Sequence, residues 1–112
     1  MGVQNVNTFY EVIRQLLNET MLVQTTLDEI RDCLLEGGKP GAVVPQLAYI
    51  NMAIGRVEHP IEVRVSEVEG RLTAIKISKS GEAILAVVAK VMDGENYNVY
   101  YRDVTELFRN GL

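Results

Sequence analysis

The sequence predicts an α+β protein: an N-terminal helical hairpin, then a four-stranded antiparallel meander, then a short C-terminal helix. Two observations predict this fold class. Apolar residues recur every three or four positions as far as residue 57, which is the period of a helix, and at every second position from residue 61, which is the period of a strand. The pair His59-Pro60 separates the two regions. Helices followed by a run of strands are typical of an α+β domain.

Length and composition indicate one folded domain. The chain has 112 residues, of which 47% are hydrophobic and 23% are charged, which is ordinary for a globular protein. We expect a single domain over 1–112, made of a helical hairpin (5–57), a β-meander (60–102) and a short helix (103–110). No apolar run is long enough for a membrane span, no signal peptide is predicted, and a single cysteine suits a reducing compartment. A cytoplasmic location is therefore expected.

The first predicted helix runs from residue 9 to residue 34. The segment from Thr8 to Glu11 matches a capping box, in which the two side chains bind free N–H groups at the start of a helix. Apolar residues then recur in alternating steps of four and three, which keeps one stripe directed towards a partner helix. This stripe consists of Phe9, Ile13, Leu16, Val23, Leu27, Ile30 and Leu34, with Thr20 as its polar member.

A second, shorter helix is predicted over residues 43–57, after a turn at residues 39–41. At a rise of about 1.5 Å per residue the first helix spans about 42 Å and the second about 22 Å, so the second covers the first only back to Thr20. Either the C-terminal half or a second copy of the chain must cover the rest. We favour a second copy and expect a homo-oligomer, with a dimer as the preferred form. The candidate interface residues are Phe9, Val12, Ile13, Leu16 and Leu17.

Four strands are predicted after residue 60. The first alternates apolar and polar residues over 61–66, and Glu69-Gly70 is expected to form the next turn. Residues 73–77 continue the pattern on a second strand. Residues 83–92 are almost continuously apolar, which predicts a central strand with both faces buried, although a buried helix also fits this composition.

Asp93-Gly94 strongly indicates a hairpin turn, because these residue types tolerate positive φ. The last strand follows at residues 97–101, and a second capping box from Asp103 to Glu106 opens the short helix. A meander of this size can also curl into a small SH3-like barrel. That alternative is one of architecture only.

No catalytic, cofactor-binding or metal-ligating residue is predicted. A metal site needs several Cys, His or carboxylate ligands at fixed spacing, whereas the chain has one cysteine, Cys33, and one histidine, His59. The glycine-rich segment at residues 37–41 lacks the spacing of a phosphate-binding loop and follows a helix. The sequence therefore favours a protein without enzymatic activity.

One cluster stands out as a possible binding surface. Three of the five tyrosines, Tyr97, Tyr100 and Tyr101, lie within five positions and are followed by Arg102, and both residue types are favoured at binding surfaces. We expect Tyr97 and Tyr101 to face the core and Tyr100 to be exposed; the alternative is that the whole cluster lies on an edge strand and receives a partner. The candidate ligand or partner surface consists of Arg64, Tyr100 and Arg102.

These features predict a small non-enzymatic interaction protein that self-associates through its first helix and presents its sheet to a partner. The alternative is a small-ligand or nucleotide-binding module with a pocket between helix and sheet. A second alternative is a small-barrel RNA-binding protein. Nucleic acid is the less favoured partner, because the net charge is −4 and the 11 basic residues are scattered.

Overall fold

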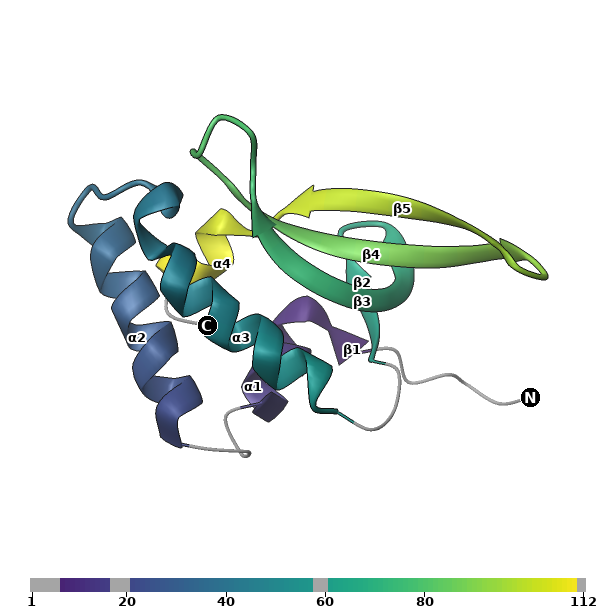
Figure 1. The fold of residues 1–112 in the computed structure, drawn as a ribbon, viewed down its shortest axis with the longest axis horizontal. Coiled ribbons are helices and arrows are strands. Elements are labelled where there is room, and N and C mark those ends of the chain that lie inside the picture. The colour runs from purple at the N-terminus through teal and green to yellow at the C-terminus, as the bar shows by residue number, and fades with distance from the viewer. Residues whose placement is uncertain (1–6, 17–20, 58–60, 111–112) are drawn as a thin grey trace.

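The computed structural model is an α+β fold in which helices precede an antiparallel sheet and a short helix follows it, as the sequence predicts (Figure 1). The structure describes residues 7–16, 21–57 and 61–110. Its helices are α1 (Phe9–Leu16), α2 (Met21–Leu35), α3 (Val44–Gly55) and α4 (Thr105–Arg109), with a 3₁₀ turn η1 (Pro40–Val43) before α3. Its strands are β1 (Asn7–Thr8), β2 (Glu62–Val65), β3 (Val68–Ile77), β4 (Ile84–Asp93) and β5 (Asn96–Asp103).

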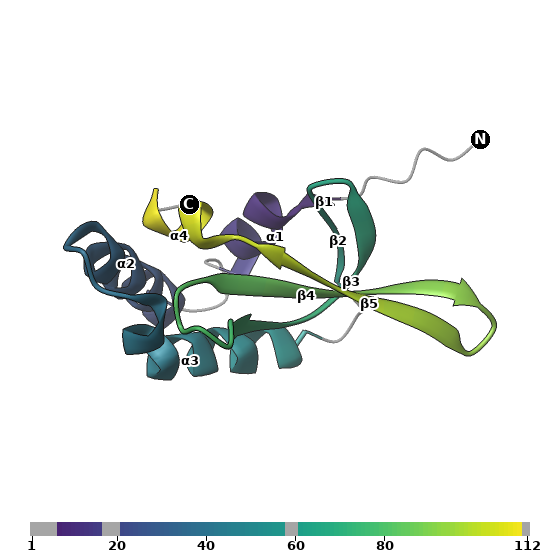
Figure 2. The same cartoon turned by 90° about the horizontal axis from the view of Figure 1, so that it is seen from above.

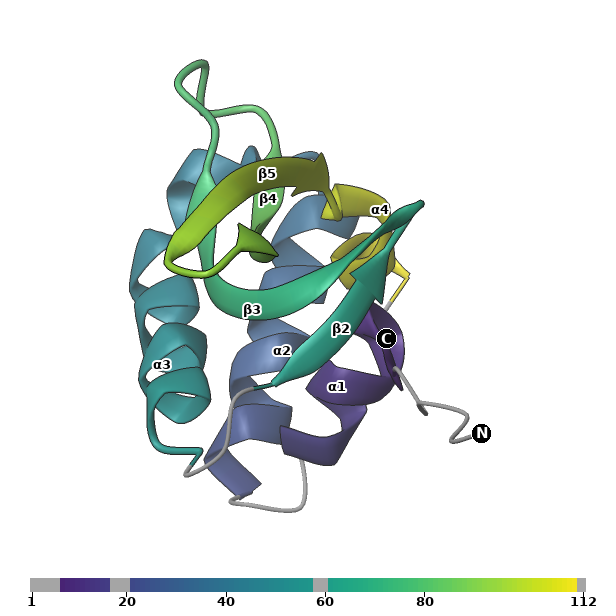
Figure 3. The ribbon, with the colours of Figure 1, turned by 90° about the vertical axis from the view of Figure 1, so that its right-hand side faces the viewer.

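The first predicted helix is two helices, so the prediction of one helix over 9–34 is wrong. Figure 3 shows that α1 and α2 run in different directions, with α1 beside β2 and α2 behind the sheet. Both helices direct their apolar residues into one core. On α1 the Phe9 ring packs edge to face on Phe108 of α4, with 5.9 Å between the ring centroids. The apolar repeat continues through both helices because one core buries both.

The predicted helix start is confirmed. The Thr8 backbone N–H donates to Glu11 Oε1 at 2.9 Å, and the Glu11 backbone N–H donates to Thr8 Oγ1 at 3.2 Å, which is the reciprocal pattern of a capping box. The predicted capping box of α4 does not form. Asp103 Oδ1 instead accepts from the N–H and the hydroxyl of Thr105, at 2.8 and 2.6 Å.

The helical hairpin consists of α2 and α3, which lie side by side (Figure 1). The 3₁₀ turn and the proline in the first turn of α3 begin the second helix close to its predicted position.

The sheet has the strand order β1-β2-β3-β4-β5, with β1 parallel to β2 and the other neighbours antiparallel. It curves strongly along β3, whose first half pairs with β2 and whose second half pairs with β4 (Figure 3). The described strands do not close into a barrel, which was the alternative architecture for the meander.

The turn between β2 and β3 lies at Ser66 and Glu67, because Val65 pairs with Val68. The predicted turn at Glu69-Gly70 is therefore wrong. Gly70 lies inside β3, where a Cβ atom would come within 2.5 Å of the Ala89 carbonyl oxygen. The glycine permits this close approach of two strands, which is a second common role of glycine in a sheet.

Residues 84–93 form a strand, which decides the ambiguity between strand and helix. Both faces of β4 are buried near its start, at Ala86, Val87 and Val88. Beyond Ala89 the strand is exposed, because the β4–β5 hairpin extends away from the helices (Figure 2). Its two-residue loop begins at Gly94, which has a φ of 55°.

Candidate interaction surface

The outer face of the β4–β5 hairpin carries an exposed apolar surface. Register pairs Ala89 with Val99 and Val91 with Tyr97, and directly opposed residues of antiparallel strands share one face. We call Ala89, Val91, Tyr97, Val99 and Tyr101 the hairpin face. Four of these side chains are strongly exposed: Val91 by 72%, Tyr97 by 60%, Tyr101 by 49% and Val99 by 42%.

The opposite face of the hairpin is polar where it leaves the core. There Lys90 lies opposite Asn98, and both are exposed. Nearer the helices the same face carries Tyr100, which packs against the core. A strand with one apolar and one polar face normally turns the apolar face to the core. In β5 the apolar alternate residues point to solvent, so the hairpin face lacks a covering layer within the described part of the chain.

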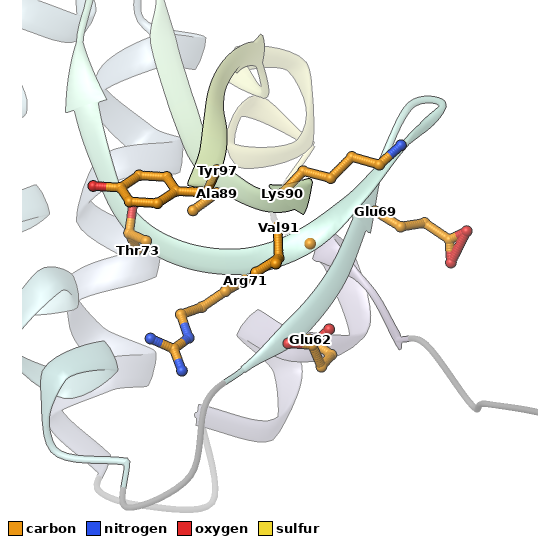
Figure 4. Close-up of a pocket in the computed structure, with 9 residues that line it drawn as sticks. Glu62, Glu69, Arg71, Thr73, Ala89, Lys90, Val91 and Tyr97 are labelled. Carbon is orange, nitrogen blue, oxygen red and sulfur yellow. The ribbon is translucent and has the colours of Figure 1, made fainter. Parts of the chain in front are cut away.

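A groove of about 620 Å³ adjoins the hairpin face and lies between the hairpin, β3 and β2 (Figure 4). Figure 4 shows Tyr97, Thr73 and Arg71 directed to the same side, with Lys90 directed away. The charged residues that line the groove are two acidic and two basic: Glu62, Glu69, Arg71 and Lys90. The groove therefore has no excess of positive charge that would favour a phosphate backbone.

At the base of the hairpin, a cation borders the hairpin face. The Lys76 ammonium lies 5.6 Å from the centroid of the Tyr101 ring, within the range of a cation–π contact. At the other end Met92, next to the turn, is exposed by 55%. The apolar hairpin face thus extends from Val91 and Tyr97 to the point where the strands enter the core.

The interface residues predicted on the first helix belong to the core of the chain itself. Phe9, Val12 and Ile13 are at most 3% exposed, so these three side chains are covered within one chain and are not a free surface for a second copy. They pack in the same cluster as Val63 of β2 and Phe108 of α4. The C-terminal half covers them, which the sequence left as the alternative. The Leu16 side chain and Leu17 lie outside what the structure describes.

The predicted partner surface of Arg64, Tyr100 and Arg102 is only partly brought together. The Arg102 guanidinium lies 5.5 Å from the centroid of the Tyr100 ring and forms an ion pair with Glu67 at 3.4 Å. Arg64 instead lines a separate cavity of about 360 Å³, together with Thr8 and Asp103.

The expected orientation of the tyrosines is reversed. Tyr97 and Tyr101 do share a face, but that face is exposed, and it is Tyr100 that packs on the core. Val91, Met92 and Val99 are exposed as well, and they were not among the predicted surface residues. Their signal was the run of apolar residues on both sides of the Asp93-Gly94 turn, which extends further than the helices can cover.

Within the described ranges, no group of three or more His, Cys, Asp or Glu side chains is placed to hold a metal ion. Cys33 is half-buried and is not in a disulfide. None of the described helices combines the length and the hydropathy needed to cross a bilayer.

Comparison of the chain with protein-family models, with curated proteins and with solved structures finds no match.

Proposed function

We propose that this chain is a small non-enzymatic interaction protein that binds a partner protein on the hairpin face. The observation that supports this proposal is the exposed apolar side of β5, with Tyr97, Val99 and Tyr101 in one row. Contiguous exposed apolar surface is uncommon on monomers and marks interaction sites. Tyrosine contributes a large apolar contact area, and its hydroxyl group can hydrogen-bond to water while the protein is unbound.

The proposed interaction surface is on the hairpin and not on the first helix. The apolar residues of α1 are used inside the chain, whereas those of the hairpin are not. We still propose that the sheet is the element presented to a partner. We also propose a cytoplasmic location, because the single cysteine, Cys33, forms no disulfide and so suits a reducing compartment.

The test of this function uses photo-crosslinking followed by titration. A photoreactive phenylalanine analogue at Tyr97, compared with the same analogue at exposed Gln24 of α2, identifies the bound protein in the producing cells. The purified partner is then titrated against Val91→Lys/Tyr97→Lys and against the control Gln15→Lys/Gln24→Lys, which adds the same charge on exposed helical positions. We expect the first variant to bind at least about tenfold more weakly, a change of about 1.4 kcal/mol, and the control to bind normally.

Equal affinity of the two variants for the partner would contradict the proposal. A salt-dependent gel shift of the wild-type chain with single-stranded RNA, abolished in Tyr97→Ser/Tyr101→Ser, would replace it with an RNA-binding function. In that case the two tyrosines would stack on bases. The open sheet and the balanced charge of the groove favour a protein partner.

A second candidate function is small-molecule binding in the cavity beside Arg64. Its volume of about 360 Å³ lies in the range of ligand pockets, and it lies between helix and sheet, next to α1 and α4. A thermal-shift screen of nucleotides and carboxylated metabolites tests it, since a ligand at 100 times its Kd adds about 2.7 kcal/mol of stability. A shift that Arg64→Ala removes would support this function, and the absence of any shift would contradict it.

A further inference from the structure

We propose that one partner of the hairpin is a second copy of this chain, joined along the free edge of β5 so that two sheets form one antiparallel sheet. The inference rests on the proposed function, because it assigns an occupant to the same hairpin. It concerns the edge of β5, whereas docking on the hairpin face also uses Val91 of β4.

The backbone geometry of β5 identifies which of its N–H and C=O groups do not pair with β4. Among the described strands, β5 is the last of the sheet and has β4 as its only neighbour. The Val104 N–H donates to the Ile84 carbonyl oxygen at 2.8 Å, and backbone bonding alternates along an antiparallel strand. The N–H and C=O groups of Tyr97, Val99 and Tyr101 therefore point away from β4. The Tyr101 carbonyl oxygen confirms this direction, because it accepts from the Arg102 side chain at 3.0 Å.

This edge carries little of the protection that monomeric proteins usually place on an exposed strand. Such edges are normally short or carry charged side chains or proline. The segment from Tyr97 to Tyr101 has neither a charge nor a proline, and β5 has 8 residues. The same three residues whose backbone groups point away from β4 also present exposed apolar side chains. Backbone pairing and side-chain contact are thus available to one occupant.

A second copy fits this edge without a charge conflict in the paired segment. Antiparallel pairing about a two-fold axis at Val99 sets Tyr97 opposite the partner's Tyr101 and Val99 opposite the partner's Val99. Aromatic pairs opposed across strands are favourable. The chain carries a net charge of −4, which repels a second copy elsewhere, but no charged side chain lies between Tyr97 and Tyr101. This uncharged segment is therefore where two copies meet at least electrostatic cost.

The available area predicts a weak and reversible dimer. With Tyr97 exposed by 60% and Tyr101 by 49%, the two rings of each copy expose roughly 200 Å². Together with the Val99 side chain and the strand edge, the interface is smaller than the roughly 1,600 Å² of a standard complex. We expect monomer and dimer to exchange, with dimer accumulating at protein concentrations of tens to hundreds of micromolar.

Two variants test the proposal by sedimentation velocity over a hundredfold concentration range. Val99→Lys sets two like charges opposite each other on the axis, and Val99→Pro removes an edge N–H that β4 does not use, a position where proline is tolerated. We expect the wild type to become dimeric at high concentration and both variants to stay monomeric with a nearly unchanged Tm. The control is Gln24→Lys, which adds the same charge at an exposed position of α2 and should leave the dimer intact.

Hydrogen exchange distinguishes edge pairing from packing of two hairpin faces. On dilution, we expect protection to be lost at the amides of Tyr97, Val99 and Tyr101. The amides of Asn98 and Tyr100, which point to β4, should not change. A wild type that stays monomeric at the highest concentration, or a dimer retained in both Val99 variants, would overturn the inference. Neither result affects the proposed function, which is tested at Val91 and Tyr97 with a different protein.

Discussion

Asn51 of α3 binds both backbone groups of Ile75 in β3. Its side-chain nitrogen donates to the Ile75 carbonyl oxygen and its side-chain oxygen accepts from the Ile75 N–H, each at 2.8 Å. At this point β3 pairs with β4 on one side, while β2 pairs only with residues 68–71. The amide therefore takes the place of a neighbouring strand. It joins the helical hairpin to the sheet and satisfies an edge where β2 has already diverged.

Replacing Asn51 with alanine should destabilise the fold. Ile75 is buried, so the substitution leaves a donor and an acceptor without partners, at a cost of about 1–3 kcal/mol for each group that water does not reach. We expect the free energy of unfolding to fall by about 2 kcal/mol in urea titrations followed by circular dichroism. The neighbouring control Met52→Ala, at a position 52% exposed, should change it by less than about 0.5 kcal/mol. Equal effects of the two variants would show that the amide bonds contribute nothing.

Gly70→Ala tests the close approach of β3 to β4. The added Cβ would lie 2.5 Å from the Ala89 carbonyl oxygen and 2.9 Å from Val88 Cγ1, and a backbone carbonyl inside a sheet cannot move away freely. We expect a loss of about 2–3 kcal/mol, as for overpacking in a core. Gly55→Ala is the matched control, because nothing lies within 4 Å of its added Cβ. In a helix that change should be neutral or stabilising by up to about 1 kcal/mol. A Gly70→Ala variant as stable as Gly55→Ala would contradict the crowding.

The capping box of α1 predicts a pH dependence. The backbone N–H and the hydroxyl of Thr8 both donate to the Glu11 carboxylate, and these bonds hold the pKa of Glu11 below its ordinary value of 4.5. A carboxyl whose pKa is lower in the folded state stabilises the fold above its unfolded pKa, and this contribution is lost as pH falls through its folded pKa. Glu11→Gln should therefore be less stable than the wild type at neutral pH, and the two thermal unfolding curves should converge in acid. A constant difference in Tm across the acid range would exclude this linkage.

The strands could be predicted because alternation of residue types reports strand periodicity directly. It placed Tyr97 and Tyr101 on one face, as the structure does. Alternation does not say what covers that face, and the core was the ordinary assumption. The assumption failed because the hairpin is longer than the helical layer beneath it (Figure 2). The position of Val91 and Val99 beyond that layer is a property of the whole fold.

The errors in the first helix and in the β2–β3 turn have the same origin. A repeat of apolar residues shows which side of a helix is buried, but not whether the helix is continuous, since α1 and α2 bury their stripes in one core. The dipeptide Glu69-Gly70 resembles a turn, yet the glycine is required by the Ala89 backbone on another strand. The shared core of α1 and α2 and the approach of Gly70 to Ala89 both bring together residues that are distant in the chain. Local sequence patterns do not encode such contacts.

Phe9 and Phe108 test whether α1 is part of the core or part of an interface. The two rings join the first and last helices at 5.9 Å, and each side chain is about 1% exposed. Phe9→Ala should lower the free energy of unfolding by about 3–5 kcal/mol, and the milder Phe9→Leu by about 1 kcal/mol. The adjacent control Tyr10→Ala, at a position 43% exposed, should cost less than about 1 kcal/mol.

The same variants separate stability from assembly. Because α1 is covered by β2 and α4 of its own chain, Phe9→Leu should leave the concentration dependence of the sedimentation coefficient as in the wild type, whereas Val99→Lys should abolish it. Loss of association in Phe9→Leu at unchanged stability would return the interface to the first helix, as the apolar repeat suggested. If Phe9→Leu loses stability but associates as the wild type does, α1 serves to fill the core, and the hairpin remains the proposed surface for partners.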